Sequence, residues 1–241
     1  MRAAPGPRMD EPACAAAAPS TRAAPVSAVR LGLFGGSFDP PHQAHLALAR
    51  AALAQLGLDC LLWLPAGRPW QKARELAPDA DRLAMLRLLV AGEPRFAIDE
   101  RELQRAGPSY TIDTLRELRS EWPQARLFLV LGQDQLAGLP SWRDWTELLE
   151  EATLAVAGRA DELVAPPPEV AACAPRLERL EMPPMAASST AIRAHLAAGG
   201  TARELAPAMV SPEVAGYIDS RRLYRTPVPD PGASPDAPAR S

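Results

Sequence analysis

The sequence contains few cysteines, no excess of basic charge and no long apolar run, and each shortage excludes a class of protein. Cys14, Cys60 and Cys173 lie far apart and form no CxxC pair, so we expect reduced thiols and neither a zinc ribbon nor a disulfide framework. The formal net charge of −3 provides no overall positive field for nucleic acid. No apolar run reaches the roughly 18 residues of a membrane span. We therefore expect a cytoplasmic protein without nucleic-acid or membrane partners.

Regular patterning is also missing from both ends of the 241-residue chain. Residues 1–27 are dominated by alanine and proline, and residues 226–241 are rich in proline. Because these ends cannot bury enough apolar surface to offset the entropy lost on ordering, we predict that both are disordered. Residues 28–225 have the size of one folded domain.

The most informative stretch of this domain is residues 29–48, VRLGLFGGSFDPPHQAHLAL. An apolar run breaks at Gly35-Gly36, and a helical pattern begins at His42. A strand leading through a glycine turn into a helix is the geometry of a phosphate site, because glycine admits a ligand close to the backbone and free N–H groups favour an anion. His42 and His45 share one helix face. A zinc site is not favoured, because the remaining histidine, His195, lies on a distant predicted helix.

Apolar periodicity predicts alternating strands and helices along the domain. After the opening strand that begins at Val29, strands are expected at residues 60–64, 96–98, 126–131, 153–157 and 177–180. Helices are expected at residues 42–56, 81–91, 111–122, 145–150, 189–198 and 212–219, with polar or irregular segments at 99–109 and 161–174. This alternation indicates a doubly wound α/β fold with a mostly parallel sheet and a small C-terminal helical part. Ligands of such sheets bind beyond the carboxyl ends of the strands.

A second polar cluster, Ser188-Ser189-Thr190-Ala191-Ile192-Arg193, lies near the end of the domain. Hydroxyl groups at a helix start either cap the helix or donate to a phosphate. Arg193 lies one turn in, on the same face as Ser189 and Thr190. Taken alone, this cluster is explained equally well by a plain helix cap with a solvated arginine.

Residues 35–45, GGSFDPPHQAH, resemble the signature GGxFDPxHxGH of the HxGH nucleotidyltransferases, with Ala44 in place of the family's glycine. The cluster at 188–193 is similar to the SSTxIR motif of the same family. Residues 98–115, 131–149 and 156–159 resemble the bacterial nicotinate-nucleotide adenylyltransferases in particular, and the likeness covers residues 29–225. It implies a Rossmann-like nucleotidyltransferase fold. It also implies transfer of AMP from ATP to nicotinate mononucleotide, with release of pyrophosphate, in NAD biosynthesis.

The resemblance also implies roles for individual residues. His42 and His45 would be catalytic and hold phosphate oxygens. ATP would contact Gly35, Gly36, Phe38, Gly132, Asp134, Ser189, Thr190 and Arg193. Nicotinate mononucleotide would contact Ser37, Lys72, Tyr110, Thr111, Trp142 and Arg159. Trp142 would stack on the pyridine ring, and backbone N–H groups near Thr111 would meet its carboxylate. Mg²⁺ would be held by the ATP phosphates and not by protein side chains.

The likeness is incomplete in one loop, and other functions remain open. The family often has PPHK or PPHR where this chain has Arg68-Pro69-Trp70-Gln71-Lys72, which keeps only the cation. Trp142 could be a core aromatic and Thr111 a helix cap. The alternatives for function are an adenylyltransferase that prefers nicotinamide mononucleotide, transfer to another phosphate such as phosphopantetheine, and a non-catalytic nucleotide sensor. The sequence leaves formation of a homo-oligomer undecided.

Overall fold

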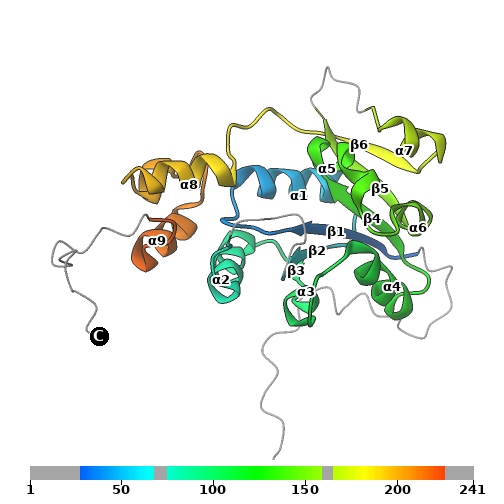
Figure 1. Ribbon diagram of the computed structural model, residues 1–241, viewed down its shortest axis with the longest axis horizontal. Helices are drawn as coiled ribbons and strands as arrows, with labels where there is room; N and C mark the ends of the chain where they lie inside the picture. The colour runs from blue at the N-terminus through cyan, green and yellow to red at the C-terminus, as the bar shows by residue number, and fades with distance from the viewer. Residues whose placement is uncertain (1–27, 68–74, 159–164, 226–241) are drawn as a thin grey trace, which may run out of the picture.

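The computed structural model describes residues 28–67, 75–158 and 165–225, which contain one six-stranded sheet (Figure 1). The predicted disordered ends, 1–27 and 226–241, lie outside the described residues. The strands lie in the order β3-β2-β1-β4-β5-β6, and every neighbouring pair is parallel. Their bounds are β1 Arg30–Gly36, β2 Cys60–Pro65, β3 Phe96–Ile98, β4 Arg126–Leu131, β5 Ala152–Gly158 and β6 Leu177–Glu181. The prediction of a doubly wound parallel sheet is confirmed.

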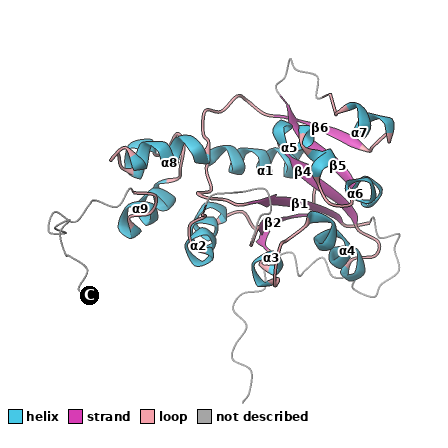
Figure 2. Ribbon diagram, viewed as in Figure 1, coloured by secondary structure: helices cyan, strands magenta, loops and turns pink. Residues whose placement is uncertain are grey.

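A helix follows each strand (Figure 2). The α-helices are α1 Gln43–Gln55, α2 Asp79–Val90, α3 Arg101–Gln104, α4 Thr111–Glu121, α5 Gln133–Ala137, α6 Trp145–Glu151, α7 Pro168–Ala172, α8 Ser189–Ala197 and α9 Pro212–Arg221. Two 3₁₀ turns span Leu139–Ser141 and Ala202–Leu205. Among the described residues no helix is long and apolar enough to cross a membrane.

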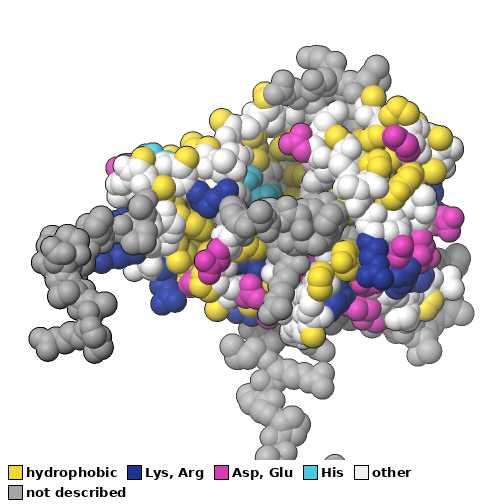
Figure 3. Space-filling view, in the orientation of Figure 1, with side chains coloured by type: hydrophobic (Ala, Val, Ile, Leu, Met, Phe, Trp, Pro, Cys, Tyr) yellow, Lys and Arg dark blue, Asp and Glu magenta, His cyan; other side chains and the backbone are white. Residues whose placement is uncertain are grey.

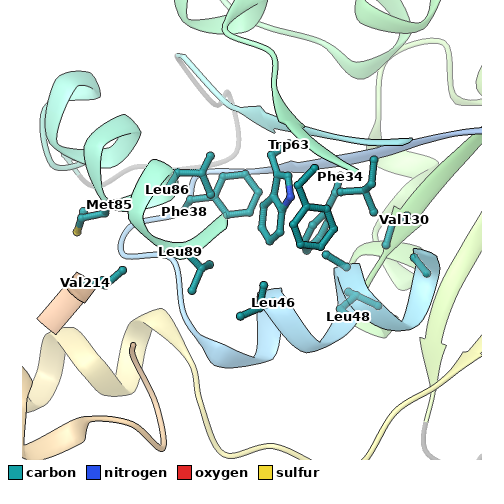
Figure 4. Packing of buried hydrophobic residues seen from close by; sticks show 14 of the residues in the cluster. Phe34, Phe38, Leu46, Leu48, Trp63, Met85, Leu86, Leu89, Val130 and Val214 are labelled. Atoms are coloured by element: carbon teal, nitrogen blue, oxygen red, sulfur yellow. The ribbon is translucent and has the colours of Figure 1, made fainter. Parts of the chain in front are cut away.

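The strands carry nearly continuous apolar sequence because helices cover both faces of the sheet. Phe34, Trp63 and Val130 point to one face and pack against α1, α2, α8 and α9. Figure 4 shows Phe34, Phe38 and Trp63 between the strands and α1. Leu33 and Leu129 point to the other face and pack against α4 and α6. The domain therefore has three layers, as the alternating pattern predicts.

Two expectations need correction. The segments 99–109 and 161–174 contain the short helices α3 and α7, and α5 was also not predicted. Helices of four or five residues make too few turns to show an apolar periodicity. The expectation of reduced thiols is wrong for Cys60, which is disulfide-bonded, whereas Cys173 is a free, exposed thiol.

The order of the strands in the sheet determines where a ligand site can lie. It reverses between β1 and β4, because the chain proceeds outward from β1 in one direction and from β4 in the other. The loops after these two strands diverge there and leave a crevice beyond their carboxyl ends. Gly36 ends β1 and Leu131 ends β4, so the glycine turn and the segment that begins at Gly132 face this crevice.

Candidate active site

The end of β1 has space beside its backbone. No described atom lies within 4 Å of the position that a Cβ at Gly35 would take. A Cβ at Gly36 would instead lie 3.0 Å from the ring of Phe38. Gly35 therefore offers the close approach to the backbone that a phosphate needs, whereas Gly36 makes room for the turn itself.

Phe38 forms the hinge of this turn. Its φ is 46°, a left-handed conformation that is uncommon for a residue with a side chain. The ring is only 1% exposed and its centroid lies 5.3 Å from that of Trp63 and 5.2 Å from that of His45. Aromatic packing therefore offsets the strain of the turn and brings the Phe38 ring against a predicted catalytic histidine. The buried ring leaves only the backbone of Phe38 to meet ATP.

The two histidines form one stacked unit at the start of α1. The ring centroids of His42 and His45 are 3.6 Å apart, and the planes differ by 22°. The backbone N–H of His42 donates to Nδ1 of His45 across 3.2 Å. Since Nδ1 of His45 accepts, the ring proton of His45 lies on Nε2, which can act as a donor.

His42 is held neutral by its surroundings. The residue is 7% exposed, and burial lowers its pKa to about 4. Its Nδ1 atom is buried and has no hydrogen-bond partner among the described residues. A buried polar atom without a partner is costly, so the position suits a group that binds a ligand.

The start of α1 has fewer free backbone N–H groups for an anion than the sequence indicates. The N–H of Gln43 donates to the carbonyl of Met209 across 2.9 Å. The expectation of free N–H groups is therefore wrong at Gln43. The side chains of the histidine pair carry more of the anion-binding capacity of this helix end than its first amide does.

The second motif packs directly on the first. Ser188 caps α8 by accepting from the N–H of Ala191. The hydroxyl of Ser189 donates to the carbonyl of Pro40 across 2.9 Å, and Nη1 of Arg193 donates to the carbonyl of Asp39 across 2.7 Å. Two motifs about 150 residues apart in sequence thus meet at one turn.

These contacts also bear on the predicted roles of the cluster. The single O–H of Ser189 donates to a backbone carbonyl in this arrangement, so it must rotate before it can donate to a phosphate. Nη2 of Arg193 donates to Oγ1 of Thr190 across 3.3 Å, which keeps both polar groups on one face of α8. His195, on the same helix, is bonded to Glu204.

A cavity of about 720 Å³ opens beyond the strand ends, a size typical of ligand sites. Figure 3 shows histidine side chains beside a hollow in this face of the molecule. Its wall includes Ala44, between the two histidines, and Asp134, in α5. The neighbouring Gly132 caps α5 and donates its N–H to Oε1 of Gln135. The methyl group of Ala44, where the resembling family has glycine, therefore faces the cavity.

Other wall residues were not predicted as site residues. Gly158 ends β5, and Met182 follows β6 directly. Met185 continues the same apolar wall. The rule that ligands sit beyond carboxyl strand ends could have identified Gly158 and Met182, because both lie within two residues of the ends of the predicted strands 153–157 and 177–180.

Three of the six residues predicted for the mononucleotide lie at or beside the start of α4. Tyr110 is the N-cap residue of α4 and Thr111 its first residue. Tyr110 and Trp142 are both partly buried against the apolar residues on the Leu33 and Leu129 face of the sheet. Cζ of Arg143 lies 4.8 Å from the centre of the Tyr110 ring, so the 142–143 segment lies beside this helix start. Arg143 is a cation that was not among the predicted site residues.

The remaining predicted contacts divide into two groups. The carbonyl of Ser37 accepts from Nη1 of Arg82 across 2.7 Å, so the backbone of Ser37 is fixed at the end of the turn. Lys72 and Arg159 lie outside the described residues.

The donor set of the site suits phosphate. It consists of histidine, hydroxyl and guanidinium groups, which donate hydrogen bonds to anions. Among the described residues there is no group of three or more His, Cys, Asp or Glu side chains that could hold a metal ion. Binding of Mg²⁺ through the phosphates of ATP stays a prediction.

Comparison with known proteins identifies the family. Residues 33–195 match the cytidylyltransferase-like family. A "Probable nicotinate-nucleotide adenylyltransferase" of Methylibium petroleiphilum is 54% identical over 198 residues, which cover 82% of this chain and 93% of that protein. A protein of the same name from Albidiferax ferrireducens is 48% identical, with coverage of 82% and 98%.

A solved structure has the same fold. The Plasmodium falciparum nicotinic acid mononucleotide adenylyltransferase, complexed with NaAD, superposes with a TM-score of 0.67 at 18% identity, covering 81% of this chain and 97% of that one. The strand order, the paired motifs and these relatives agree. The chain belongs to the cytidylyltransferase-like family and, within it, to the nicotinate-nucleotide adenylyltransferases.

Proposed function

We propose that the protein transfers the AMP part of ATP to nicotinate mononucleotide, giving deamido-NAD and pyrophosphate, in NAD biosynthesis. The observation that carries this proposal is the docking of α8 on the glycine turn. Through Arg193 and Ser189 it joins two phosphate-binding motifs at the reversal of the strand order. The names of relatives 54% and 48% identical to this chain support the choice of acceptor.

The reaction is a displacement at phosphorus. A 5′-phosphate oxygen of the mononucleotide forms a bond to the α-phosphorus of ATP, and the bond from that phosphorus to the bridging oxygen of the β-phosphate breaks. Pyrophosphate leaves with the electron pair of that bond. The chain contributes by holding the reactants in line and by donating hydrogen bonds to the charge on the transferring group.

The histidine pair supplies the donors. Nε2 of His45 carries a proton, and His42 lies beside it in the stacked unit. A neutral imidazole is a directional donor that needs no change of protonation during the reaction. Arg193 and Thr190, at the start of α8, hold the leaving pyrophosphate, because a guanidinium group binds phosphate oxygens with strong charge-assisted hydrogen bonds.

The two substrates occupy the two sides of the crevice. Adenosine lies in the 720 Å³ cavity, with its base against the wall formed by Met182 and Met185 and its ribose near Asp134. Nicotinate lies at the start of α4, where Trp142 stacks on the ring and the N–H of Thr111 meets the carboxylate. A site whose donors face a carboxylate rejects the amide of nicotinamide mononucleotide, whose NH₂ group would meet donors.

Three further properties belong to the proposal. Mg²⁺ would be held by the phosphates of ATP and would neutralise part of their charge. The enzyme acts in the cytoplasm. Light scattering of the full chain decides whether it forms a homo-oligomer, which the sequence leaves undecided.

Product analysis tests the function. The full chain is incubated with ATP, MgCl₂ and nicotinate mononucleotide, and the products are identified by mass spectrometry. We expect deamido-NAD and pyrophosphate in equal amounts, and neither product when the mononucleotide is omitted. ATP binding without product would favour the nucleotide sensor, and product formed only with phosphopantetheine would assign another acceptor.

A further inference from the structure

Arg82, in the first turn of α2, is a charged side chain that is fully buried. Its Nη1 donates to the carbonyl of Ser37 and its Nη2 to the carbonyl of Ala66, both across 2.7 Å. Nε donates to the carbonyl of Ala77 across 3.2 Å. Nη2 also pairs with the half-exposed carboxylate of Asp79. Most of the hydrogen-bonding capacity of this guanidinium group is thus used on backbone carbonyls.

The three carbonyls belong to three different segments. Ser37 follows β1, Ala66 follows β2, and Ala77 precedes α2. One planar group therefore joins the carboxyl ends of two neighbouring strands to the start of a helix. A guanidinium group can do this because its five N–H donors lie in a fixed plane, whereas the ammonium group of lysine donates from a single atom.

Asp39 holds the same turn from the other side. Its side chain is fully buried, and Oδ1 accepts from the N–H of Ala77 and from the hydroxyl of Tyr224. Ala77 thus donates to Asp39 and accepts from Arg82. Arg82 holds Ser37, the residue before Phe38, through its carbonyl. The side-chain hydrogen bonds of Asp39 hold the residue after Phe38.

Phe38 connects this arrangement to the histidine pair. It adopts the left-handed conformation between two residues that are held in place, and its ring lies 5.2 Å from that of His45 in an edge-on contact. A release of the Ser37 carbonyl would let Phe38 relax and its ring move. The ring of His45 would then lose one of the surfaces against which it rests.

Burial of a guanidinium group costs free energy, and an apolar residue could fill the same volume more cheaply. We propose that Arg82 is a positioning residue for the transfer reaction. It fixes the turn 37–39 so that Phe38 keeps His45 in place to donate to the transferring phosphate. This inference rests on the proposed function and extends it to a residue that touches no substrate.

The test compares Arg82→Lys with Arg87→Lys. Arg87 lies on the same helix, is 61% exposed and pairs with Glu100, so its substitution is the matched control. For both variants and the wild type, kcat and both KM values are measured with ATP and nicotinate mononucleotide. Thermal unfolding reports the fold, and ¹⁵N NMR of the imidazole nitrogens reports the state of His45.

We expect Arg82→Lys to fold and to lower kcat by about 10- to 100-fold, the loss that misplacement of a catalytic group produces. The KM for ATP should change less, because most residues of the cavity wall lie at the ends of β4, β5 and β6, away from Arg82. The imidazole nitrogen resonances of His45 should shift in Arg82→Lys. Arg87→Lys should match the wild type in all measurements.

A folded Arg82→Lys with wild-type kcat overturns the inference. So does a loss of activity that only follows the unfolded fraction while the His45 resonances stay unchanged. If Arg82→Lys does not fold, Phe38→Leu tests the same link, because it removes the ring contact and leaves Arg82 in place. Wild-type kcat and unshifted His45 resonances in Phe38→Leu would then refute the inference. Absence of turnover in the wild type would refute the proposed function, whereas the resonance shift would still test the positioning.

Discussion

The backbone N–H of His42 donates to Nδ1 of His45 across 3.2 Å while the two rings stack 3.6 Å apart. This bond selects the tautomer of His45 with its proton on Nε2. Burial keeps His42 neutral as well. The pair therefore acts in our account as two directional donors rather than as a base, which agrees with a reaction in which a phosphate oxygen is already a competent nucleophile.

Replacement of His45 should slow the chemical step. His45→Ala removes one donor to the transferring group, and loss of such a donor costs roughly 3 kcal/mol in the barrier, or about 100-fold in kcat. Steady-state pyrophosphate release measures the effect. His195→Ala is the control, because His195 is bonded to Glu204 at the other end of α8. A near-normal kcat in His45→Ala would refute the assignment of His45.

Burial of His42 makes stability depend on pH. The pKa of His42 is about 4 in the folded chain against 6.5 when unfolded, so between these values only the unfolded chain takes up the proton. The stabilisation is complete above pH 6.5 and is lost as the pH falls towards 4, by roughly 3 kcal/mol in total.

Urea unfolding at pH 7.5 and pH 4.5 measures this contribution. Other groups titrate in the same range, so the informative quantity is the difference between the wild type and His42→Gln, which does not titrate. The wild type should lose more free energy of unfolding on acidification than the variant loses. Equal losses would show that His42 is not protected from protonation.

A methyl group at Gly35 should affect binding and not folding. The Cβ would enter space in which no described atom lies within 4 Å, so Gly35→Ala creates no clash. The same methyl group would occupy the approach to the backbone that we assign to ATP. We expect an unchanged melting temperature and a KM for ATP raised by about tenfold, equivalent to about 1.4 kcal/mol. An unchanged KM would move ATP away from this strand end.

Removal of the Trp142 ring should weaken one substrate selectively. Stacking between a base and an aromatic ring is worth about 1–3 kcal/mol. Trp142→Ala should therefore raise the KM for nicotinate mononucleotide by about 5- to 150-fold while the KM for ATP stays near the wild-type value. Trp142→Phe keeps an aromatic face and should recover much of the loss. Equal effects on both substrates would indicate that Trp142 is a core aromatic instead.

The sequence predicts the fold and the turn well because both depend on local pattern. Apolar runs of three to six residues separated by helical periodicity suffice to indicate a parallel sheet. The short helices α3, α5 and α7 were not predicted, since their formation depends on tertiary contacts rather than on periodicity. The disulfide state of Cys60 is likewise not encoded by any local spacing.

The site was predictable where a motif supplies both chemistry and position. The histidine pair is an example, because two residues three positions apart on a helix lie on the same face. The contacts of Ser189 and Arg193 with the carbonyls of Pro40 and Asp39 were not predictable, since they join residues about 150 positions apart. Arg82 gives no sequence signal at all, because a buried arginine on an amphipathic helix has the same pattern as an exposed one.

The choice between acid and amide substrates is the first test of adenylyl transfer to nicotinate mononucleotide. Pyrophosphate release is measured with ATP and Mg²⁺ while nicotinate mononucleotide and nicotinamide mononucleotide are offered in parallel. The account predicts a kcat/KM at least about 100-fold higher for the acid, because a site that donates to a carboxylate leaves the amide unpaired. Equal kcat/KM values would contradict the placement of the carboxylate at Thr111, and turnover with neither substrate would contradict adenylyl transfer to a pyridine nucleotide.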